Sequence, residues 1–247
     1  MKKLLVLLTM VSIIIGQEQI SGYITMGDSL YRQFDNKGAL EKYLSALKMD
    51  SLNYEANWKA ARAFVDVGET LEGESRAVHY SSGEAYARRA TRIDSTGSKG
   101  HLFLSIALGR VALDASAKKR IQLSKEIKKE VDLAIKYDPN DDIAYHVLGR
   151  WHRKLSNLSW IEKTFANMFL GGVPEEASNE NALKNFKRAI EIHPEHINHH
   201  LELGITYQMM GWNELARTEF QRCLDLPQSD SDDARYKAEA QERINDL

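Results

Sequence analysis

Apolar and small residues recur along this chain with the three- and four-residue spacing of amphipathic helices, and the helices come in pairs. The first pair lies in residues 20–53, where polar turn residues before Gly38 separate two apolar faces. Its first helix carries Tyr23, Met26, Gly27 and Leu30, and its second carries Ala39, Tyr43 and Ala46. Small residues set among large apolar ones indicate helices that cross closely.

The same register continues in residues 54–97, 98–141, 142–194 and 197–230. The 10-residue step from Pro139 to Gly149 recurs between Pro194 and Gly204, which is the strongest internal sign of a repeat. We therefore predict an all-α, TPR-like helical-repeat solenoid of about five helix–turn–helix repeats. The polar, amphipathic last residues are predicted to form a C-terminal capping helix.

Two repeats exceed the standard unit of about 34 residues by about ten residues each. In residues 54–97 the excess falls in the polar stretch GETLEGESRAVHYSSGE, where we expect a long loop or a short extra turn. In residues 98–141 it includes the basic stretch SAKKRIQLSKEIKKE, which we expect to lengthen the helices and to present a solvated face.

The repeat in residues 142–194 is split by an insertion of 21 residues beyond the usual spacing from Gly149 to Ala182. The inserted stretch LSNLSWIEKTFANMF is too apolar for a loop, and its spacing predicts a helix with one apolar face. This helix either packs on its own solenoid as a lid over the groove or one edge, or exposes a patch for a partner or a lipid surface. The residues predicted to form the insert lid are Leu158, Trp160, Ile161, Phe165 and Phe169.

From Gly149 to the C-terminus the chain carries a more specific pattern: LGRW, the insert motif SWIEK, MF shortly before a proline, and ALKNF in the next helix. On these residues it resembles the regulator of microtubule dynamics family, a group of TPR-like proteins. The resemblance implies a helical-repeat fold. Eukaryotic members of that family are described as microtubule-associated or organelle-membrane proteins, and none is an established enzyme.

The N-terminus has the pattern of a secretory signal peptide. Lys2 and Lys3 precede an apolar run from Leu4 to Ile15, too short to be a comfortable membrane span. We predict a signal peptide in residues 1–16 and a TPR-like repeat domain in residues 17–247, with an uncleaved anchor as the alternative. The protein is then expected in the periplasm or envelope, and a protein exported from a bacterium does not meet microtubules.

Composition and motifs exclude several classes of protein. A formal net charge of −2 argues against a nucleic-acid partner, and the single cysteine, Cys223, excludes an internal disulfide and a cysteine metal cage. The sequence has no phosphate-binding glycine loop, no hydrolase elbow and no zinc-protease motif. We therefore predict no enzyme, no catalytic residue and no cofactor.

Four histidines straddle the turn between two repeats. Two or three of His193, His196, His199 and His200 could converge on zinc. The sequence shows no carboxylate or cysteine at a matching position, and His200 falls in a packing slot of the repeat. No metal site is predicted.

The first helix of each repeat is expected to line a concave groove, because residues one turn apart project together. The groove residues predicted in this way are Trp58, Arg62, Arg110, His146, Arg150, Arg153 and Lys154. Their arginines either form a basic stripe for a carboxylate or phosphate, or pair with Glu55, Asp28 or Asp66.

These features predict a non-catalytic binding or scaffold module of the cell envelope that holds a protein or peptide partner in its groove. The alternative is a lipid-binding or transfer protein, or a carrier of another anionic or acyl ligand, that uses the groove under the inserted helix.

Overall fold

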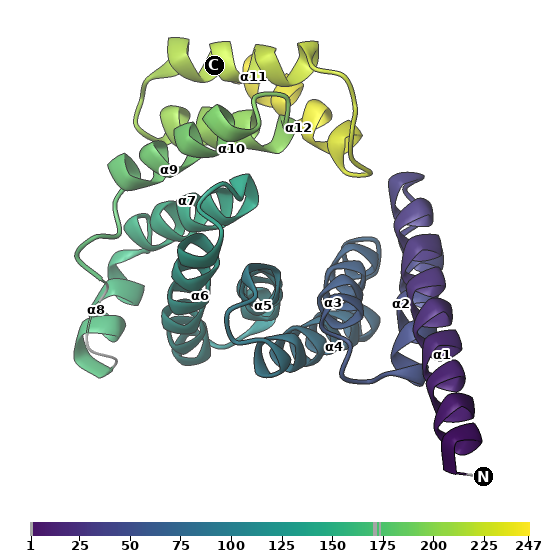
Figure 1. Ribbon diagram of the computed structural model, residues 1–247. Coiled ribbons are helices and arrows are strands. Elements are labelled where there is room, and N and C mark those ends of the chain that lie inside the picture. The colour runs from purple at the N-terminus through teal and green to yellow at the C-terminus, as the bar shows by residue number, and fades with distance from the viewer. Residues whose placement is uncertain (1, 170–171, 173) are drawn as a thin grey trace. The chain divides into compact units, whose positions relative to one another are not determined.

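The computed structural model describes the backbone of residues 2–169, 172 and 174–247, and the side chains of residues 16–160, 162–164, 166–167, 172 and 174–247. Within these ranges the chain is helical and contains no strand (Figure 1). The helices are α1 (Lys2–Arg32), α2 (Asn36–Met49), α3 (Tyr54–Glu69), α4 (Gly73–Ile93), α5 (Ser98–Val111), the 3-10 turn η1 (Ala112–Asp114), α6 (Ala117–Tyr137), α7 (Asp142–Ser156), α8 (Trp160–Phe169), α9 (Asn179–Ile192), α10 (Ile197–Met209), α11 (Asn213–Asp225) and α12 (Asp233–Asn245). This order confirms the predicted all-α, TPR-like architecture, with α8 as the inserted helix.

The helices form two compact units: unit 1 ends at Asp114 and unit 2 begins at Ala115. In unit 1, α1 packs on α2, α3 on α4 and α4 on α5. Side-chain caps start α2 and α3, since Asp35 accepts a hydrogen bond from the Gly38 amide and Asn53 from the Ala56 amide. The buried core of α1–α3 is made of alanines interleaved with larger side chains such as Tyr43 and Leu47.

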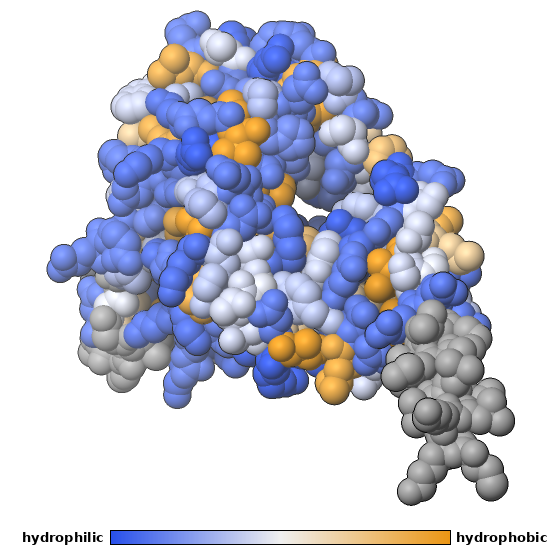
Figure 2. Space-filling model, in the orientation of Figure 1, coloured by the Kyte–Doolittle hydropathy of each residue, from blue (hydrophilic) through white to orange (hydrophobic). Residues whose placement is uncertain are grey.

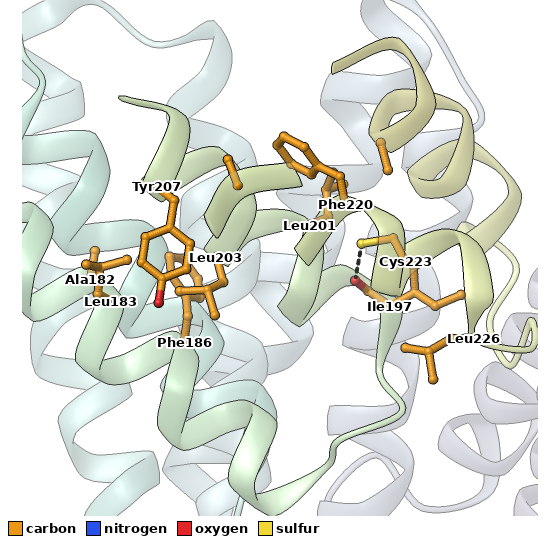
Figure 3. Close-up of a cluster of buried hydrophobic side chains, with 12 residues drawn as sticks. Ala182, Leu183, Phe186, Ile197, Leu201, Leu203, Tyr207, Phe220, Cys223 and Leu226 are labelled. Carbon is orange, nitrogen blue, oxygen red and sulfur yellow. Dashed lines mark hydrogen bonds between the residues drawn. The ribbon is translucent and has the colours of Figure 1, made fainter. Parts of the chain in front are cut away.

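In unit 2, α7 packs on α9, α10 on α11, and α12 on both α11 and α10. Figure 3 shows Phe186 of α9 and Phe220 of α11 on either side of the apolar face of α10. Cys223 lies in this core with no exposed surface, and its thiol lies 3.5 Å from the carbonyl oxygen of Ile197. Burial raises the pKa of its thiol to about 12.

One packing device recurs in both units: a glycine on the first helix of a pair receives an aromatic ring from the second. A methyl group at Gly149 would lie 2.7 Å from the Phe186 ring, and one at Gly204 would lie 2.5 Å from the Phe220 ring. Gly27 and Tyr43 make the same approach in unit 1. The glycines therefore set how closely the paired helices cross.

Two predictions of local structure have different outcomes. The prediction of a long loop or a short extra turn between Gly68 and Glu84 is wrong: only residues 70–72 separate α3 from α4, and the rest is helical. The polar side chains misled the prediction, because they lie on the outer face of a 21-residue helix. The basic stretch after Ser116 does extend a helix, but the added length belongs to α6 alone.

At the N-terminus, α1 runs without a break from Lys2 to Arg32, so the predicted signal segment and the first repeat helix form one helix. The side chains of residues 2–15 lie outside the described set. Among the described residues, no helix combines the length and the apolar character needed to cross a membrane. The signal peptide itself stays a prediction.

Candidate functional site

Four side chains from the first helices of three successive pairs meet in unit 1. The Trp58 ring of α3 stacks on the Phe103 ring of α5, with centroids 5.4 Å apart and planes 4° apart. The Arg62 guanidinium lies 3.5 Å from the centroid of Tyr31, on α1, and 5.5 Å from that of Trp58. We call Tyr31, Trp58, Arg62 and Phe103 the aromatic–arginine layer. All four are half-buried, so each keeps part of its surface exposed.

A buried polar group supports this layer from within. Tyr43 donates a hydrogen bond to Asp28 at 2.8 Å, and Arg62 Nη2 lies 3.4 Å from the Tyr43 hydroxyl. Lys59, 8% exposed, forms ion pairs of 2.6 Å with both Asp28 and Glu55. Burial and the hydrogen bond to Asp28 raise the pKa of Tyr43 well above its usual value. Two carboxylates named in the sequence analysis as partners for the arginines therefore pair with Lys59.

Arg110, the third residue predicted for the groove in unit 1, is half-buried on α5. It forms an ion pair of 2.5 Å with Glu69 at the end of α3. The positive charge of Arg110 is thus compensated within unit 1.

In unit 2 the predicted groove arginines converge on one buried carboxylate. Glu202 of α10, 8% exposed, pairs with Arg150 at 3.3 Å and also with Arg153, both on α7. Arg153 is itself buried, and its guanidinium lies 5.9 Å from the Phe186 ring. Burial lowers the pKa of Arg153, and the charge of Glu202 acts against that shift. This Glu202 ion cluster is a buried structural charge group. Lys154, the last predicted groove residue, is exposed.

A second polar group in unit 2 joins the start of α7 to the turn between α9 and α10. Asp142 Oδ2 lies 2.9 Å from His199 Nε2 and 3.2 Å from His193 Nδ1. The rings of His196 and His199 stack with centroids 4.1 Å apart. We call Asp142, His193, His196 and His199 the histidine cluster. Its members are brought together by the packing of α7 on α9 and α10.

Behind this cluster, His146 is fully buried, and its Nδ1 lies 2.9 Å from His199 Nδ1. Burial lowers the pKa of His199 to about 4. Burial acts to raise the pKa of Asp142, but the neighbouring histidines, His199 first among them, lower it to about 2. Burial also lowers the pKa of His146 and of His196. At neutral pH Asp142 is therefore charged, and His146, His196 and His199 are neutral. A neutral His199 that donates from Nε2 to Asp142 must accept at Nδ1 from His146.

The prediction that no carboxylate matches the histidines is wrong, because Asp142 does. Asp142 precedes His193 by 51 residues, and only the helix packing brings its side chain to the turn. His200, in contrast, is buried as its slot predicted, with ring nitrogens 2.7 Å from Glu219 and 2.9 Å from the carbonyl oxygen of Pro194.

The insert forms α8, and a capping box begins it: the Glu162 amide donates to Ser159 Oγ, and Glu162 accepts from the Ser159 amide. α8 contacts α6 of its own unit, where Glu162 pairs with Arg120 at 3.2 Å. Trp160 is 79% exposed and Leu158 half-buried. The side chains of the other predicted lid residues, Ile161, Phe165 and Phe169, lie outside the described residues. Figure 2 shows a largely hydrophilic face with only scattered hydrophobic patches.

The predicted groove residues thus fall into two groups, one in each unit. Trp58 and Arg62 meet in unit 1, while Arg150 and Arg153 meet at Glu202 in unit 2, close to His146. A groove that joins the two groups stays a prediction. The sequence prediction did not include Phe103 or Glu202. Phe103 lies seven residues before Arg110, a spacing of about two helical turns that places both on one face of α5, although it does not indicate the contact with Trp58. Glu202 meets Arg150 and Arg153 only through the packing of α10 on α7, which no local spacing records.

The family model described as Regulator of microtubule dynamics protein 1-3 matches residues 23–247. Regulator of microtubule dynamics protein 3 of Rattus norvegicus is 30% identical over 75% of this chain and 40% of its own length. Regulator of microtubule dynamics protein 1 of Caenorhabditis elegans is 25% identical over 86% of this chain and 93% of its own. The chain spans about half the length of the mammalian type 3 relatives that it matches.

Among solved structures, a thermophilic TPR protein of Thermus thermophilus superposes with a TM-score of 0.67. It is 17% identical in sequence, over 90% of this chain and 99% of its own. At that identity the likeness shows the TPR-like fold alone.

Proposed function

This chain belongs to the family of Regulator of microtubule dynamics protein 1-3, and from that premise we propose that it is a protein-binding module whose contact surface is the aromatic–arginine layer. The family and the TPR-like fold are generally non-catalytic, and repeats of this kind generally bind proteins or peptides. The partner and the surface used are our proposal.

One observation supports this surface above all: the aromatic–arginine layer crosses α1, α3 and α5, the first helices of three successive pairs. Rigid aromatic rings and arginine carry most of the binding energy at protein interfaces, because they bury large areas at a small cost in side-chain entropy. Arg62 is held between Tyr31 and Trp58, so its guanidinium is already placed for a partner. An extended peptide lying across the three helices would contact all four side chains.

The ion pairs of the predicted groove arginines support a small anionic ligand less than they support a peptide. Arg110 pairs with Glu69, and Arg150 and Arg153 pair with Glu202. A free phosphate or carboxylate would have to displace these partners. Arg62 differs, because aromatic rings surround its guanidinium and one polar contact is the Tyr43 hydroxyl, 3.4 Å from Nη2. The layer therefore favours a peptide with apolar side chains and a carbonyl or carboxylate near Arg62.

A displayed library of extended peptides, panned against the full chain, tests this proposal. Selected peptides should lose roughly tenfold or more of their affinity with Trp58→Ala or Phe103→Ala, as measured by fluorescence anisotropy. Trp212→Ala, a change of an exposed tryptophan in unit 2, is the control and should leave affinity unchanged. Binders that tolerate every change in the layer would overturn the proposal.

A second candidate follows from the inserted helix. The apolar sequence of α8 and the 79% exposed Trp160 favour contact with an acyl chain or a lipid surface. Native mass spectrometry of the purified protein would show a lipid adduct, and Trp160→Ala should weaken its retention. A protein that carries no adduct and does not bind anionic vesicles would exclude this candidate.

We also propose that residues 1–16 direct export to the periplasm or envelope of a bacterial host, a location that would exclude microtubules as partners. The basic residues and the following apolar run support this. N-terminal sequencing of the protein from the envelope fraction should begin at Gln17. A full-length chain that stays in the cytoplasm would contradict it.

A further inference from the structure

The histidine cluster has no part in the proposed binding surface, which lies in unit 1. It gathers three imidazoles and one carboxylate where α7, α9 and α10 meet in unit 2. Single ligand atoms of Asp142, His196 and His199 lie within 4.8 Å of one another. His193 also contacts Asp142, with its Nδ1 3.2 Å from Oδ2. Imidazole nitrogens and carboxylate oxygens are the ligands that Zn²⁺ takes outside cysteine sites.

Two of the distances between ligand atoms in the cluster are close to those between the ligands of a tetrahedral site. Zn²⁺ lies about 2.0–2.2 Å from nitrogen and oxygen ligands, which places two such ligands roughly 3.3–3.5 Å apart. Asp142 Oδ2 and His199 Nε2 are 2.9 Å apart, and Asp142 Oδ2 and His193 Nδ1 are 3.2 Å apart. An ion bound by these two pairs requires side-chain shifts of only a few tenths of an ångström. The His196 ring lies 9° from parallel on His199, so it must rotate out of this stack before both rings can point a nitrogen at the same ion.

Hydrogen bonding alone leaves one group of the cluster unexplained. His196 Nδ1 is buried and has no hydrogen-bond partner among the described residues. An orphan buried nitrogen costs about 1–3 kcal/mol, so it indicates an unaccounted ligand.

The hydrogen bond on the far side of His199 also fits an ion. A histidine that binds metal through Nε2 donates its other ring hydrogen to a neighbour, which fixes the ring. His199 has such a neighbour, since its Nδ1 lies 2.9 Å from Nδ1 of the buried His146. When His199 binds an ion through Nε2, the proton that Nε2 carried is taken up at Nε2 of His146 while the shared proton moves to Nδ1 of His199, so both imidazoles stay neutral and the buried hydrogen bond is kept. His193 is 50% exposed and leaves a path from solvent.

We propose that Asp142, His193, His196 and His199 bind one Zn²⁺ or a similar divalent transition-metal ion. The ion joins the first turn of α7 to the end of α9 and the start of α10. Because four protein ligands fill a tetrahedral shell, the site is structural and stabilises unit 2. It has no open position for a substrate.

Calorimetric titration of untagged, chelator-treated full-length protein with ZnCl₂ is the test. We expect saturation at one ion per chain, a rise of about 5 °C or more in the unfolding midpoint under saturating Zn²⁺, and the visible absorption of tetrahedral Co²⁺ after substitution. Saturation without these changes, or no saturation, would overturn the proposal.

Variants then locate the ion. Asp142→Asn and His199→Gln should each lower the affinity for Zn²⁺ by tenfold or more. His193→Gln should also lower it, and this half-exposed position is the safer test if the buried variants fold poorly. His79→Gln, a change of a half-buried histidine in unit 1, is the matched control and should bind as the wild type does. Full affinity in both His193→Gln and Asp142→Asn would place the ion elsewhere and overturn the proposal.

Discussion

Unit 1 and unit 2 fill the same packing slot with two aromatic residues that differ by one hydroxyl group. Tyr43 covers Gly27 in unit 1, and Phe186 covers Gly149 in unit 2. The Tyr43 hydroxyl donates to Asp28 and contacts Arg62, so polar groups gather around it. Phe186 has no such group, and its ring meets the edge of His146 with centroids 5.7 Å apart. The glycine–ring contact is therefore the same in both units. Only the ring with a hydroxyl group, that of Tyr43, hydrogen-bonds to a carboxylate.

The two units also differ in how they treat charge. In unit 1 a buried Lys59 is shared by Asp28 and the more exposed Glu55. In unit 2 a buried Glu202 is shared by two arginines, of which Arg153 is buried as well. Removal of the Glu202 carboxylate in unit 2 should therefore lower the free energy of unfolding far more than removal of the Glu55 carboxylate in unit 1.

The largest effect is expected for Glu202→Ala, which leaves Arg153 charged and buried with no carboxylate. The free energy of unfolding should fall by about 3–5 kcal/mol. Glu55→Ala, which leaves Lys59 paired with Asp28, should cost no more than about 1 kcal/mol. Urea unfolding followed by far-UV circular dichroism measures both. Equal losses would contradict the contrast between the units.

Acid should destabilise the metal-free protein through unit 2. The folded-state pKa of His199 is about 4, below its ordinary 6.5, so its neutral form stabilises the fold above pH 6.5 and this contribution is lost as the pH falls toward 4. Asp142, at about 2, extends the loss below pH 4. For His199 the decrease is on the order of 3 kcal/mol at pH 4. Urea midpoints measured with chelator present should fall over this range, and less steeply in His199→Gln.

A smaller effect is expected for Tyr43→Phe, which gives unit 1 the residue type that unit 2 already has. It removes the hydrogen bond to Asp28 but leaves the ion pair of Asp28 with Lys59, so the loss should be about 1 kcal/mol. Cation–π contact of Arg62 with Tyr31 should persist. Thermal unfolding measures the change. A loss as large as that for Glu202→Ala would mean that the hydroxyl holds the whole polar group together.

The smallest effect is expected for Trp160→Ala on α8. Its side chain is 79% exposed, so the stability should change by no more than about 0.5 kcal/mol. Intrinsic fluorescence of the folded protein should lose its most solvent-exposed component. A destabilisation above about 1 kcal/mol would show that Trp160 packs on its own unit, unlike the exposed position described.

Periodicity was enough to predict the helix pairs, the inserted helix and the capping helix, because each depends on which face of a helix is apolar. It failed between Gly68 and Glu84, where a polar sequence belongs to a long helix with only a narrow buried stripe. Trp58 and Arg62 were identified because they lie one turn apart. Phe103, Asp142 and Glu202 were not, since their contacts join residues 41 or more positions apart in the sequence. No local pattern records such a contact.

The position of α8 has a consequence for engineering. The glycine–ring contact of Gly149 and Phe186 holds α7 and α9 together although residues 157–178 lie between them, where residues 33–35 suffice for α1 and α2. As a flexible loop, the longer connection would cost only about 2 kcal/mol more in loop-closure free energy than the connection between α1 and α2. The junctions at Asn157 and Ser178 are therefore natural graft points. A reporter peptide or a foreign loop spliced between them should leave the helix pair, and the repeats that follow it, in place.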